Sequence, residues 1–521
     1  MTDTPVLEMN ESFKQALRLM DGSSQNIFIT GKAGTGKSTL LQYFRDHTQK
    51  SIVVLAPTGV AAVNVKGQTI HSFFRFKPDV TVGSIKKQKA QPDGKKNIYQ
   101  KLDTLIIDEI SMVRADLMDC MDRFLRLNGR DPSKPFGGLQ LIFFGDLYQL
   151  APVVSTQARE IFQTRYSSPY FFSANVFNEI DLTLVELDQI YRQKDTTFIE
   201  ILNAVRNNTV TQGQLDILNR RYVPDLQPSN EGLSVFLTPT NKAAQAINDE
   251  QLKRLEGKYH FFDGITSGSF DNGHLPAPKE LQLKIGSQVM MLNNDAKQRW
   301  INGTMARVLR IFQDTDDYET IVQVELENGR KANVTPYKWE LYNYKLKNES
   351  IVSEIAGGFR QYPLTLAWGI TVHKSQGKTF DKAVIDLGDN VFSSGQTYVA
   401  LSRCTSLEGL SLRQPVLKKH IRTDPRVVEF LTAHQYKVAN KTLPVNHKMH
   451  ILGQAADQKK TLSIIYLQSN GIKTARRIEP QEVKEMTYQG QPYQGVKAYC
   501  QLAEKQIIFQ VHQILEIKEA P

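Results

Sequence analysis

The run GKAGTGKST, Gly31–Thr39, constrains the fold of this chain more than any other stretch. It follows the phosphate-binding pattern of a glycine, four residues, and then Gly-Lys-Ser. The apolar run 26–30 before it is typical of a buried strand, and 39–44 after it begins a helical pattern. A strand, a glycine-rich turn and a helix in this order predict an α/β domain that binds a nucleoside triphosphate.

The residues of this loop also predict how the phosphates are held. Glycines let the backbone wrap closely around a polyphosphate, and successive N–H groups at the start of the helix point toward it. Lys37 is expected to reach the β- and γ-phosphates, and Ser38 to ligate Mg²⁺. The nucleotide-binding residues predicted in the loop are Gly31, Ala33, Gly34, Thr35, Gly36, Lys37, Ser38 and Thr39.

The composition bounds the class of protein. A chain of 521 residues is too long for one core, so several domains are expected. The net charge of +10 fits a polyanionic partner, although solvated lysines alone would also explain it. Cys120, Cys404 and Cys500 are far apart and favour a reducing compartment without a metal cluster. The N-terminus lacks the features of a signal peptide and no apolar run has membrane-spanning length, so a cytoplasmic protein is expected.

Two further strands of the first domain end in residues that suit phosphate hydrolysis. The apolar run 102–107 delivers Asp108 and Glu109 at its carboxyl end. Asp108 is expected to bind the same Mg²⁺ as Ser38, and Glu109 to polarise the attacking water. The strand 140–144 runs into Gly-Asp, and Gln149 behind it is placed to sense the γ-phosphate. The first domain is expected to close near residue 175.

Polar residues at other turns are candidates for contact with a polyanion. Thr58 and Gly59 follow the strand 51–56 and could hold a phosphate or simply form a tight turn. In GQTIHSFFRF, residues 67–76, aromatic and polar side chains interleave as in proteins that stack single-stranded bases, although at least two of the phenylalanines are expected to be core. The polar stretch 77–101, with Pro-Asp-Gly and several lysines, predicts a small inserted hairpin or a solvated loop.

The rest of the chain predicts a second α/β domain, an insertion and a C-terminal domain. A strand near 234–238 followed by a helix repeats the strand–turn–helix pattern of 53–62, which suggests two α/β domains in tandem with a cleft between them. Short β-like runs separated by Asn-Gly turns over 286–344 predict a small inserted barrel. A polar linker is expected over 437–460, followed by a small β domain over 461–521.

Taken in order, these motifs resemble the Pif (petite integration frequency) family of superfamily-one DNA helicases, relatives of the RecD-like enzymes. The resemblance covers roughly 9–428, and 109–127 is similar to the family's signature helix. The motifs that carry it are GKAGTGKST, APTGVAA, TIHSFF, IIDEISM, FFGDLYQLAPV, YRQ, LAWGITVHKSQGKTF and YVALSRCTS.

The resemblance implies two RecA-like domains, with ATP and Mg²⁺ between them and single-stranded DNA across their tops. It implies ATP-driven 5′→3′ translocation and unwinding of duplex or forked DNA, by a monomer without a membrane partner. The expected domains are 1–175 for the first, with a separation wedge at 77–101, then 176–285 and 345–436 for the second, with a Src-homology-three-type barrel at 286–344.

The resemblance also assigns roles to residues. Lys37 and Glu109 would act in hydrolysis, and Gln149 would couple the γ-phosphate to domain closure. Arg192 and Arg403 would be arginine fingers, the alternative being surface ion pairs. Gln376 and Gly377 would join the nucleotide site. The positions that would meet DNA, or relay between DNA and ATP, are Thr58, Gly59, His71, Ser72, Phe73, Thr238, Asn241, Thr371, His373 and Lys374.

Two regions depart from the patterns that they resemble. Phe13 stands where the family carries a glutamine that reads adenine, and a phenyl ring can stack on a base but cannot read its edge. We therefore assign Phe13 to the base site and expect weak preference for ATP. The C-terminal segment resembles, more weakly, a WYL domain of bacterial nucleic-acid proteins, but Tyr493-Gln494-Gly495 replaces the Trp-Tyr-Leu run.

Two alternatives compete with a helicase. One is a DNA-stimulated ATPase that translocates without separating strands. The other is a nucleotide-gated binding module whose catalysis has decayed, against which the intact Lys37, Glu109, Arg192 and Arg403 argue.

Overall fold

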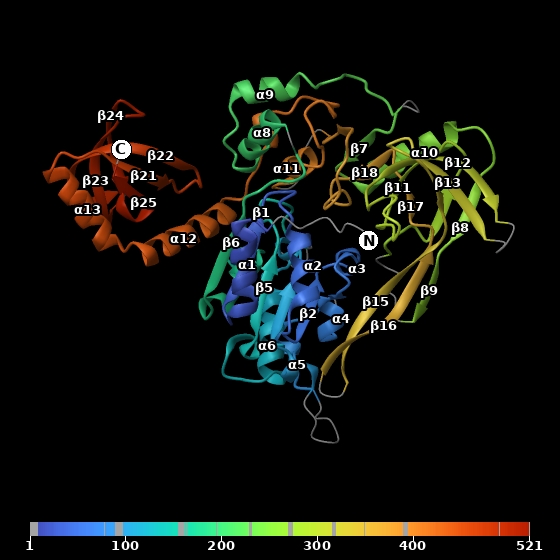
Figure 1. Cartoon of the computed structure of the whole chain (residues 1–521), viewed down its shortest axis with the longest axis horizontal. Helices are drawn as coiled ribbons and strands as arrows, with labels where there is room; N and C mark the ends of the chain where they lie inside the picture. The colour runs from blue at the N-terminus through green and yellow to red at the C-terminus, as the bar shows by residue number, and fades with distance from the viewer. Residues whose placement is uncertain are drawn as a thin grey trace. The chain divides into compact units, whose positions relative to one another are not determined.

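Six parallel strands form the sheet of the first α/β domain, in the order β3-β2-β4-β5-β1-β6 (Figure 1). The strands are β1 (Asn26–Gly31), β2 (Ile52–Ala56), β3 (Gln68–Thr69), β4 (Thr104–Ile107), β5 (Gln140–Phe144) and β6 (Leu182–Leu187). Nearly all residues of β1, β2, β4 and β5 are buried, which explains why these strands appear in the sequence as continuous apolar runs. The computed structural model describes residues 9–77, 79–88, 97–154, 162, 164–193, 195–228, 232–268, 275–314, 319–347, 350–388, 394–488 and 490–519.

Helices follow the strands of this sheet. They are α1 (Glu11–Gly22), α2 (Lys37–His47), α3 (Gly59–Asn64), α4 (Ile70–Phe74), α5 (Ile98–Lys101) and α6 (Ala115–Asn128), with 3-10 turns η1 (Val82–Ser84), η2 (Ile110–Met112), η3 (Pro135–Gly138), η4 (Phe171–Ser173) and η5 (Asn175–Asn178). Because the strands are parallel, the segments that follow β1, β4 and β5 meet at one edge of the sheet. This edge carries the phosphate loop and the predicted acids.

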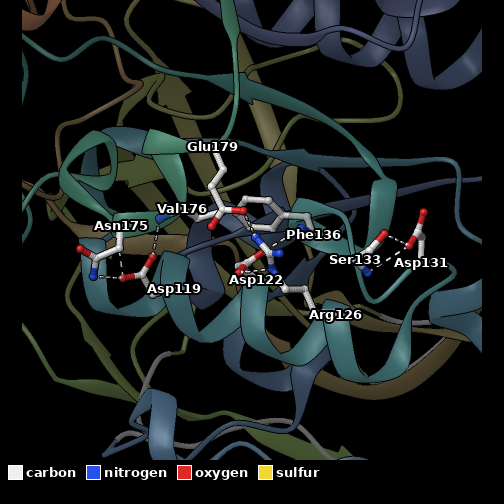
Figure 2. A network of polar contacts seen from close by, with 9 residues as sticks. All are labelled: Asp119, Asp122, Arg126, Asp131, Ser133, Phe136, Asn175, Val176 and Glu179. Carbon is white, nitrogen blue, oxygen red and sulfur yellow. Dashed lines mark hydrogen bonds and ion pairs between the residues drawn. The ribbon is translucent and has the colours of Figure 1, made fainter.

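Carboxylates of α6 fix the loops around it, as Figure 2 shows. Asp119 accepts hydrogen bonds from the backbone N–H of Asn175 and of Val176, both at 3.1 Å. Asp122 accepts one from the backbone N–H of Phe136 at 2.7 Å and pairs with Arg126 at 2.8 Å. The helix that resembles the family signature is therefore a scaffold for the segments that flank β5.

Four parallel strands form the second α/β domain, in the order β18-β7-β19-β20. They are β7 (Val235–Thr238), β18 (Gly369–Thr371), β19 (Ala383–Ile385) and β20 (Leu410–Leu412), accompanied by α8 (Thr196–Arg206), α9 (Gln212–Asn219), α10 (Asn241–Arg254), α11 (Gln396–Leu401) and η6 (Lys418–His420). One core joins Phe198, Leu237 and Val399, and Leu150 from the segment after β5 packs into it. Two parallel α/β sheets confirm the predicted fold class.

The inserted β region is larger than the expected 286–344. Its strands are β8 (His260–Asp263), β9 (Ile265–Gly268), β10 (Glu280–Leu283), β11 (Gln288–Met291), β12 (Met305–Gln313), β13 (Thr320–Leu326), β14 (Lys331–Val334), β15 (Tyr337–Lys347), β16 (Ser350–Gln361) and β17 (Leu364–Leu366). β14, β13, β12, β11 and β17 form one sheet over a core that contains Val289, Val322 and Leu364. Residues 345–361, expected in the second α/β domain, instead lie in a ribbon because β16 pairs with β15 along its length.

The β15–β16 ribbon reaches the first domain and lies against α3 and α5 (Figure 1). The Tyr344 hydroxyl accepts a hydrogen bond from the backbone N–H of Val54 at 3.2 Å. Gln68 Nε2 donates to Asn343 Oδ1 at 2.7 Å, and the Tyr344 ring meets the edge of Phe73. Since β3 is only two residues long, this ribbon supplies the partner that the edge of β2 would otherwise lack.

The predicted wedge at 77–101 lies only partly in the structure. The described part contains η1 and α5. The Pro-Asp-Gly turn and residues 89–96 lie outside the described residues. The predicted hairpin therefore stays a prediction.

The C-terminal unit, 423–521, is a compact body of its own. Its antiparallel sheet has the order β24-β23-β22-β21-β25, with β21 (Leu462–Leu467), β22 (Lys473–Tyr488), β23 (Gln491–Cys500), β24 (Lys505–Gln510) and β25 (Ile514–Glu519), and it is accompanied by α12 (Pro425–Thr442), α13 (Val445–Asp457) and η7 (Val511–Gln513). All strand pairs are antiparallel. The resemblance to a WYL domain stays a prediction.

The expectation of a linker over 437–460 is wrong. Most of that stretch is helical, and Leu452 and Ala455 of α13 pack against the sheet. The buried Lys448 ties the unit together, because its ammonium donates to Asn440 Oδ1 and to the Ile514 carbonyl, both at 2.6 Å. Polar residues on the outer faces of these helices hid the apolar stripe in the sequence.

The three cysteines are buried and free. Among the described residues, no helix has both the length and the apolar character required to cross a bilayer.

Candidate nucleotide site

The phosphate loop forms a cradle that only glycine permits. Gly34 and Gly36 have φ of +82° and +83°, a conformation that residues with a Cβ rarely adopt. A Cβ on Gly34 would lie 2.4 Å from Cβ of Arg192, and one on Gly36 would lie 3.0 Å from the Phe13 ring. Gly36 is also the N-cap of α2 and offers no side chain to cap it, so the first N–H groups of the helix are left for a phosphate. The cradle fits a nucleotide.

Lys37 is folded back on the loop that precedes it. Its Nζ donates to the carbonyls of Gly31 at 2.7 Å and Lys32 at 2.9 Å. Burial lowers the pKa of Lys37, whereas the carboxylates of Asp146 and Glu109 act in the opposite direction. The ammonium is thus held at the base of the cradle by weak acceptors that phosphate oxygens can replace.

The two acids follow β4 as predicted. Glu109 has φ of +50°, a strained conformation for a residue other than glycine, and such strain concentrates at functional sites. Burial, and then the charge of Glu109, raises the pKa of Asp108 to about 7. Burial likewise raises the pKa of Glu109. Two adjacent carboxylates that resist ionisation favour a nearby cation, so Asp108, with the exposed hydroxyl of Ser38, fits Mg²⁺.

Arg192 and Arg403 reach the same site from beyond the first domain. Arg192 approaches the carbonyls of Gly377 and Ser402, both at 3.5 Å. Arg403 is 1% exposed, and burial and the neighbouring Arg192 lower its pKa to about 9. In the part of the chain that the structure describes, the hydrogen bonds of both guanidinium groups go to backbone carbonyls and to the Ser402 hydroxyl, not to a carboxylate. The alternative of a surface ion pair is therefore wrong for Arg403, and both charges suit an anionic ligand.

Two amide side chains connect the domains at the acid. Gln376 Nε2 lies 3.2 Å from Glu109 Oε2 and 3.2 Å from Gln149 Oε1. Gln149 is 8% exposed, and Gly377 follows Gln376 in a left-handed turn with φ of +79°. The structure thus brings these predicted residues to one place.

Two residues of this site were missed by sequence reasoning. The Tyr398 hydroxyl accepts a hydrogen bond from the backbone N–H of Ala33 in the phosphate loop, at 3.2 Å. Arg206 is buried and lies 3.3 Å from Asp146. Tyr398 lies inside a motif already quoted, YVALSR. The available signal for Arg206 was a charged residue that continues the apolar face of a helix after Leu202.

The assignment of Phe13 to base contact is wrong in this structure. Phe13 is 1% exposed and its ring packs beneath Gly36 in the core of the first domain. Polar groups lie nearby instead, since Asn10 Nδ2 donates to Gln189 Oε1 at 3.0 Å and to the Tyr191 hydroxyl at 3.3 Å.

The predicted DNA-contact residues fall into two groups, at the carboxyl ends of the strands of each α/β domain. Thr58, His71 and Ser72 lie on α3 and α4 or cap them, and Asn241, His373 and Lys374 lie beyond β7 and β18. Ser72, Asn241, His373 and Lys374 are exposed, while Thr58, Gly59 and His71 are half-buried.

Three residues of that set are buried and cannot offer a side chain to DNA. Phe73 is 5% exposed and packs edge-on against Phe74 and Tyr99, in agreement with the expectation that two of these phenylalanines are core. Thr238 is fully buried, and its hydroxyl lies 3.1 Å from the Thr240 carbonyl. Thr371 is 4% exposed and accepts a hydrogen bond from the backbone N–H of Lys374. For the two threonines only the relay role remains.

Comparison with known proteins gives consistent results. Residues 8–215 match the family model described as PIF1-like helicase. The ATP-dependent DNA helicase Pif1 of Bdellovibrio bacteriovorus is 33% identical over 438 residues, which cover 82% of this chain and 92% of that protein. The ATP-dependent DNA helicase PIF1 of Homo sapiens is 34% identical, and the match covers 78% of this chain and 61% of the human protein.

Solved structures agree. Bacteroides sp Pif1 in complex with ADP-AlF4 is 36% identical, with a TM-score of 0.75 and a match that covers 82% of this chain and 97% of that one. Bacteroides Pif1 bound to ssDNA is 37% identical with the same coverage, and its TM-score is 0.59.

Proposed function

The chain belongs to the PIF1-like helicase family, and on that premise we propose that it is an ATP-dependent DNA helicase whose ATP site lies between its two α/β domains. It moves 5′→3′ along single-stranded DNA and unwinds the duplex ahead. The observation that carries this proposal is the pair of guanidinium groups of Arg192, half-buried beside Gly34 of the phosphate loop, and of Arg403, fully buried, whose hydrogen bonds among the described residues go to no carboxylate.

The residues of the site divide the work of hydrolysis. Ser38 and Asp108 would hold Mg²⁺, which neutralises charge on the β- and γ-phosphates when bound. Lys37 exchanges the carbonyls of Gly31 and Lys32 for phosphate oxygens. Glu109 orients the attacking water and accepts its proton. Arg192 and Arg403 stabilise the charge that spreads over the γ-phosphoryl oxygens.

The side-chain amides of Gln149 and Gln376 respond to whether a γ-phosphate occupies the site. Gln376 bridges Glu109 and Gln149 across the domains, so a γ-phosphate that enters must compete with this bridge. When a hydrogen bond from Gln376 or Gln149 to phosphate replaces this bridge, the contact between the two domains changes. This is the step that converts hydrolysis into movement along DNA.

We assign the single-stranded DNA to the exposed positions at the strand ends of the two α/β domains, from Ser72 in the first to Lys374 in the second. Solved structures of Bacteroides Pif1 are bound to ssDNA and to forked dsDNA, which supports this choice of partner. We further propose that the first domain extends to residue 187, beyond the expected 175, because β6 pairs with β1 in its sheet. The second domain then comprises 188–259 and 367–422 around the insertion 260–366, and the chain acts as a monomer in the bacterial cytosol.

Unwinding is expected on a fluorescent duplex that carries a 5′ single-stranded tail, alone or in a fork. It is not expected on a duplex that carries only a 3′ tail. Both substrates should stimulate ATP hydrolysis, because each supplies single-stranded DNA. ATP hydrolysis on the 5′-tailed fork without strand separation would instead identify a translocase.

Discrimination between ATP and GTP is expected to stay within about tenfold in kcat/KM, because Phe13, at the position of the family's adenine-reading glutamine, is buried and offers the base no polar group. Competition kinetics with the two nucleotides measure it. A strong preference for ATP would mean that another group reads the base. Gln189→Ala would then test the exposed amide that accepts a hydrogen bond from Asn10.

The C-terminal unit is expected to add DNA affinity through Lys473 and Arg477, which are exposed. Each phosphate neutralised on a single strand contributes about −0.7 to the slope of log affinity against log salt. The double variant Lys473→Ala/Arg477→Ala should therefore flatten that slope by about 1.4 and spare turnover at saturating DNA. Lys484→Ala is the matched control, because Lys484 already pairs with Glu482 at 2.7 Å. Equal slopes for parent and double variant would make this unit a docking or folding appendage.

A further inference from the structure

Arg206 is a buried charge at the end of α8 that hydrolysis, as described above, does not use. It is 7% exposed, and its guanidinium lies 3.3 Å from Asp146 Oδ1 and 3.9 Å from Glu186. The guanidinium also stacks over the Tyr148 ring, 4.1 Å from its centroid. A planar, permanently charged group is thus fixed in one orientation by three partners.

The pair that Arg206 forms with Asp146 lies in the interior. Asp146 is 1% exposed, and burial of two charges is costly unless their geometry is good. Burial alone disfavours the charged guanidinium, yet the carboxylate of Asp146 raises the pKa of Arg206. Removal of either partner would leave the other charge in the interior, without a second group that compensates it as well. Such a pair is weak evidence for stability and better evidence for a fixed geometry.

The pair also joins the two α/β domains. α8 belongs to the core of the second domain through Phe198, Leu202 and Val205. Asp146 follows β5 of the first domain, and Leu150 of the same segment packs into the core of the second. The segment 146–150 of the first domain therefore contacts the second domain at both ends. Arg206 binds Asp146 at its start, and Leu150 packs into the second core at its end.

Asp146 passes this constraint to the predicted sensor of the γ-phosphate. One of its oxygens, Oδ1, accepts from Arg206 and from the backbone N–H of Tyr148 at 3.1 Å. The other, Oδ2, lies 3.3 Å from Gln149 Nε2. With its nitrogen held there, Gln149 must turn its oxygen toward Gln376, which also donates to Glu109.

We propose that Arg206 is a positioning residue of the ATPase reaction, which orients the carboxamide of Gln149 through Asp146 and so sets the bridge from Gln376 to Glu109. The inference rests on the proposed function of this site. Arg206 touches neither nucleotide nor water in this role. It determines which way the amide of Gln149 faces, and thereby couples the position of α8 to hydrolysis.

The test is a double-mutant cycle in DNA-stimulated ATP hydrolysis by the full chain. Arg206→Gln should lower kcat by about 10- to 100-fold, the loss usual when a group that orients a functional residue is removed, and leave KM for ATP within about threefold. In a Gln149→Ala background the same change should cost nothing further, because the residue through which Arg206 acts is already absent. Arg206→Lys should retain more activity than Arg206→Gln, since it keeps the charge but loses the planar fork.

Controls separate this inference from the proposed function. Arg126→Gln breaks the partly buried ion pair that Arg126 forms with Asp122 within α6, and should leave kcat unchanged. If Gln149→Ala turns over like the parent, the role proposed for Gln149 fails, and this inference fails with it. If Gln149→Ala is slow while Arg206→Gln is not, or if the two losses multiply in the double variant, only the role of Arg206 is overturned. Should Arg206→Gln not fold, Arg206→Lys in both backgrounds decides by the same comparison.

Discussion

Lys37→Ala is expected to abolish ATP hydrolysis at any concentration of single-stranded DNA. The substitution removes the ammonium of Lys37, whose Nζ lies within 2.9 Å of two carbonyls of the phosphate loop. Backbone N–H groups would remain to hold phosphate, but no positive charge would reach the β- and γ-oxygens from beneath. Turnover measured with saturating DNA checks this, and a rate near that of the parent would show that the nucleotide lies elsewhere.

The same variant should fold as well as the parent or better. Because burial lowers the pKa of Lys37, the folded state disfavours its charged form, and a neutral side chain removes that disadvantage. Lys50→Ala is a matched control. Lys50 Nζ also donates to backbone carbonyls, those of Met20 at 2.7 Å and Ser23 at 2.8 Å, but away from the phosphate loop. The turnover of Lys50→Ala should match that of the parent, in contrast to the turnover of Lys37→Ala, although burial lowers the pKa of both lysines.

Arg403→Ala should lower turnover by about three to five orders of magnitude, the range for an arginine finger, with nucleotide binding largely retained. A pKa of about 9 keeps Arg403 charged at neutral pH, and an arriving γ-phosphate favours that charge further. Its contacts to the carbonyls of Ser375 and Lys378, at 3.4 and 3.3 Å, are long enough to yield to phosphate oxygens.

Single-turnover kinetics and equilibrium nucleotide binding together measure this effect. Arg413→Ala serves as a control in the same domain, because Arg413 pairs with Asp386 at 2.8 Å and should not affect the chemistry. Loss of binding with unchanged turnover in Arg403→Ala would identify a residue that only maintains the fold around Ser402.

Much of this site could be predicted because its signals are local. The phosphate loop, and the acids behind β4, follow directly from short apolar strands that end in polar residues. What the sequence did not reveal depends on partners far along the chain. The burial of Phe13 under Gly36 requires the loop geometry, and the burial of Phe73 requires Tyr344 of the ribbon.

Three further features of the structure could not be predicted from local sequence patterns, each for a physical reason. The residues 345–361 were expected to belong to an α/β domain, since the sheet that β15 and β16 form with β9 has only a small core, around Trp339 and Phe359, to mark it. The helix α13 was mistaken for a linker because only one narrow stripe of it, around Leu452, faces the sheet. Arg206 was passed over because a single arginine gives no pattern until Asp146 is placed beside it.

The contact between Val54 and Tyr344 has a consequence for synthesis of the chain. The two residues are 290 positions apart, and a ribosome that adds about 5 to 20 residues per second needs about 15 to 60 s to span them. During that interval the first domain has emerged from the ribosome. The backbone N–H of Val54 in β2, however, still lacks its acceptor, the Tyr344 hydroxyl. An open strand edge of this kind recruits other chains. Nascent chains that stall before β15 should therefore be the form of this protein that most needs a chaperone.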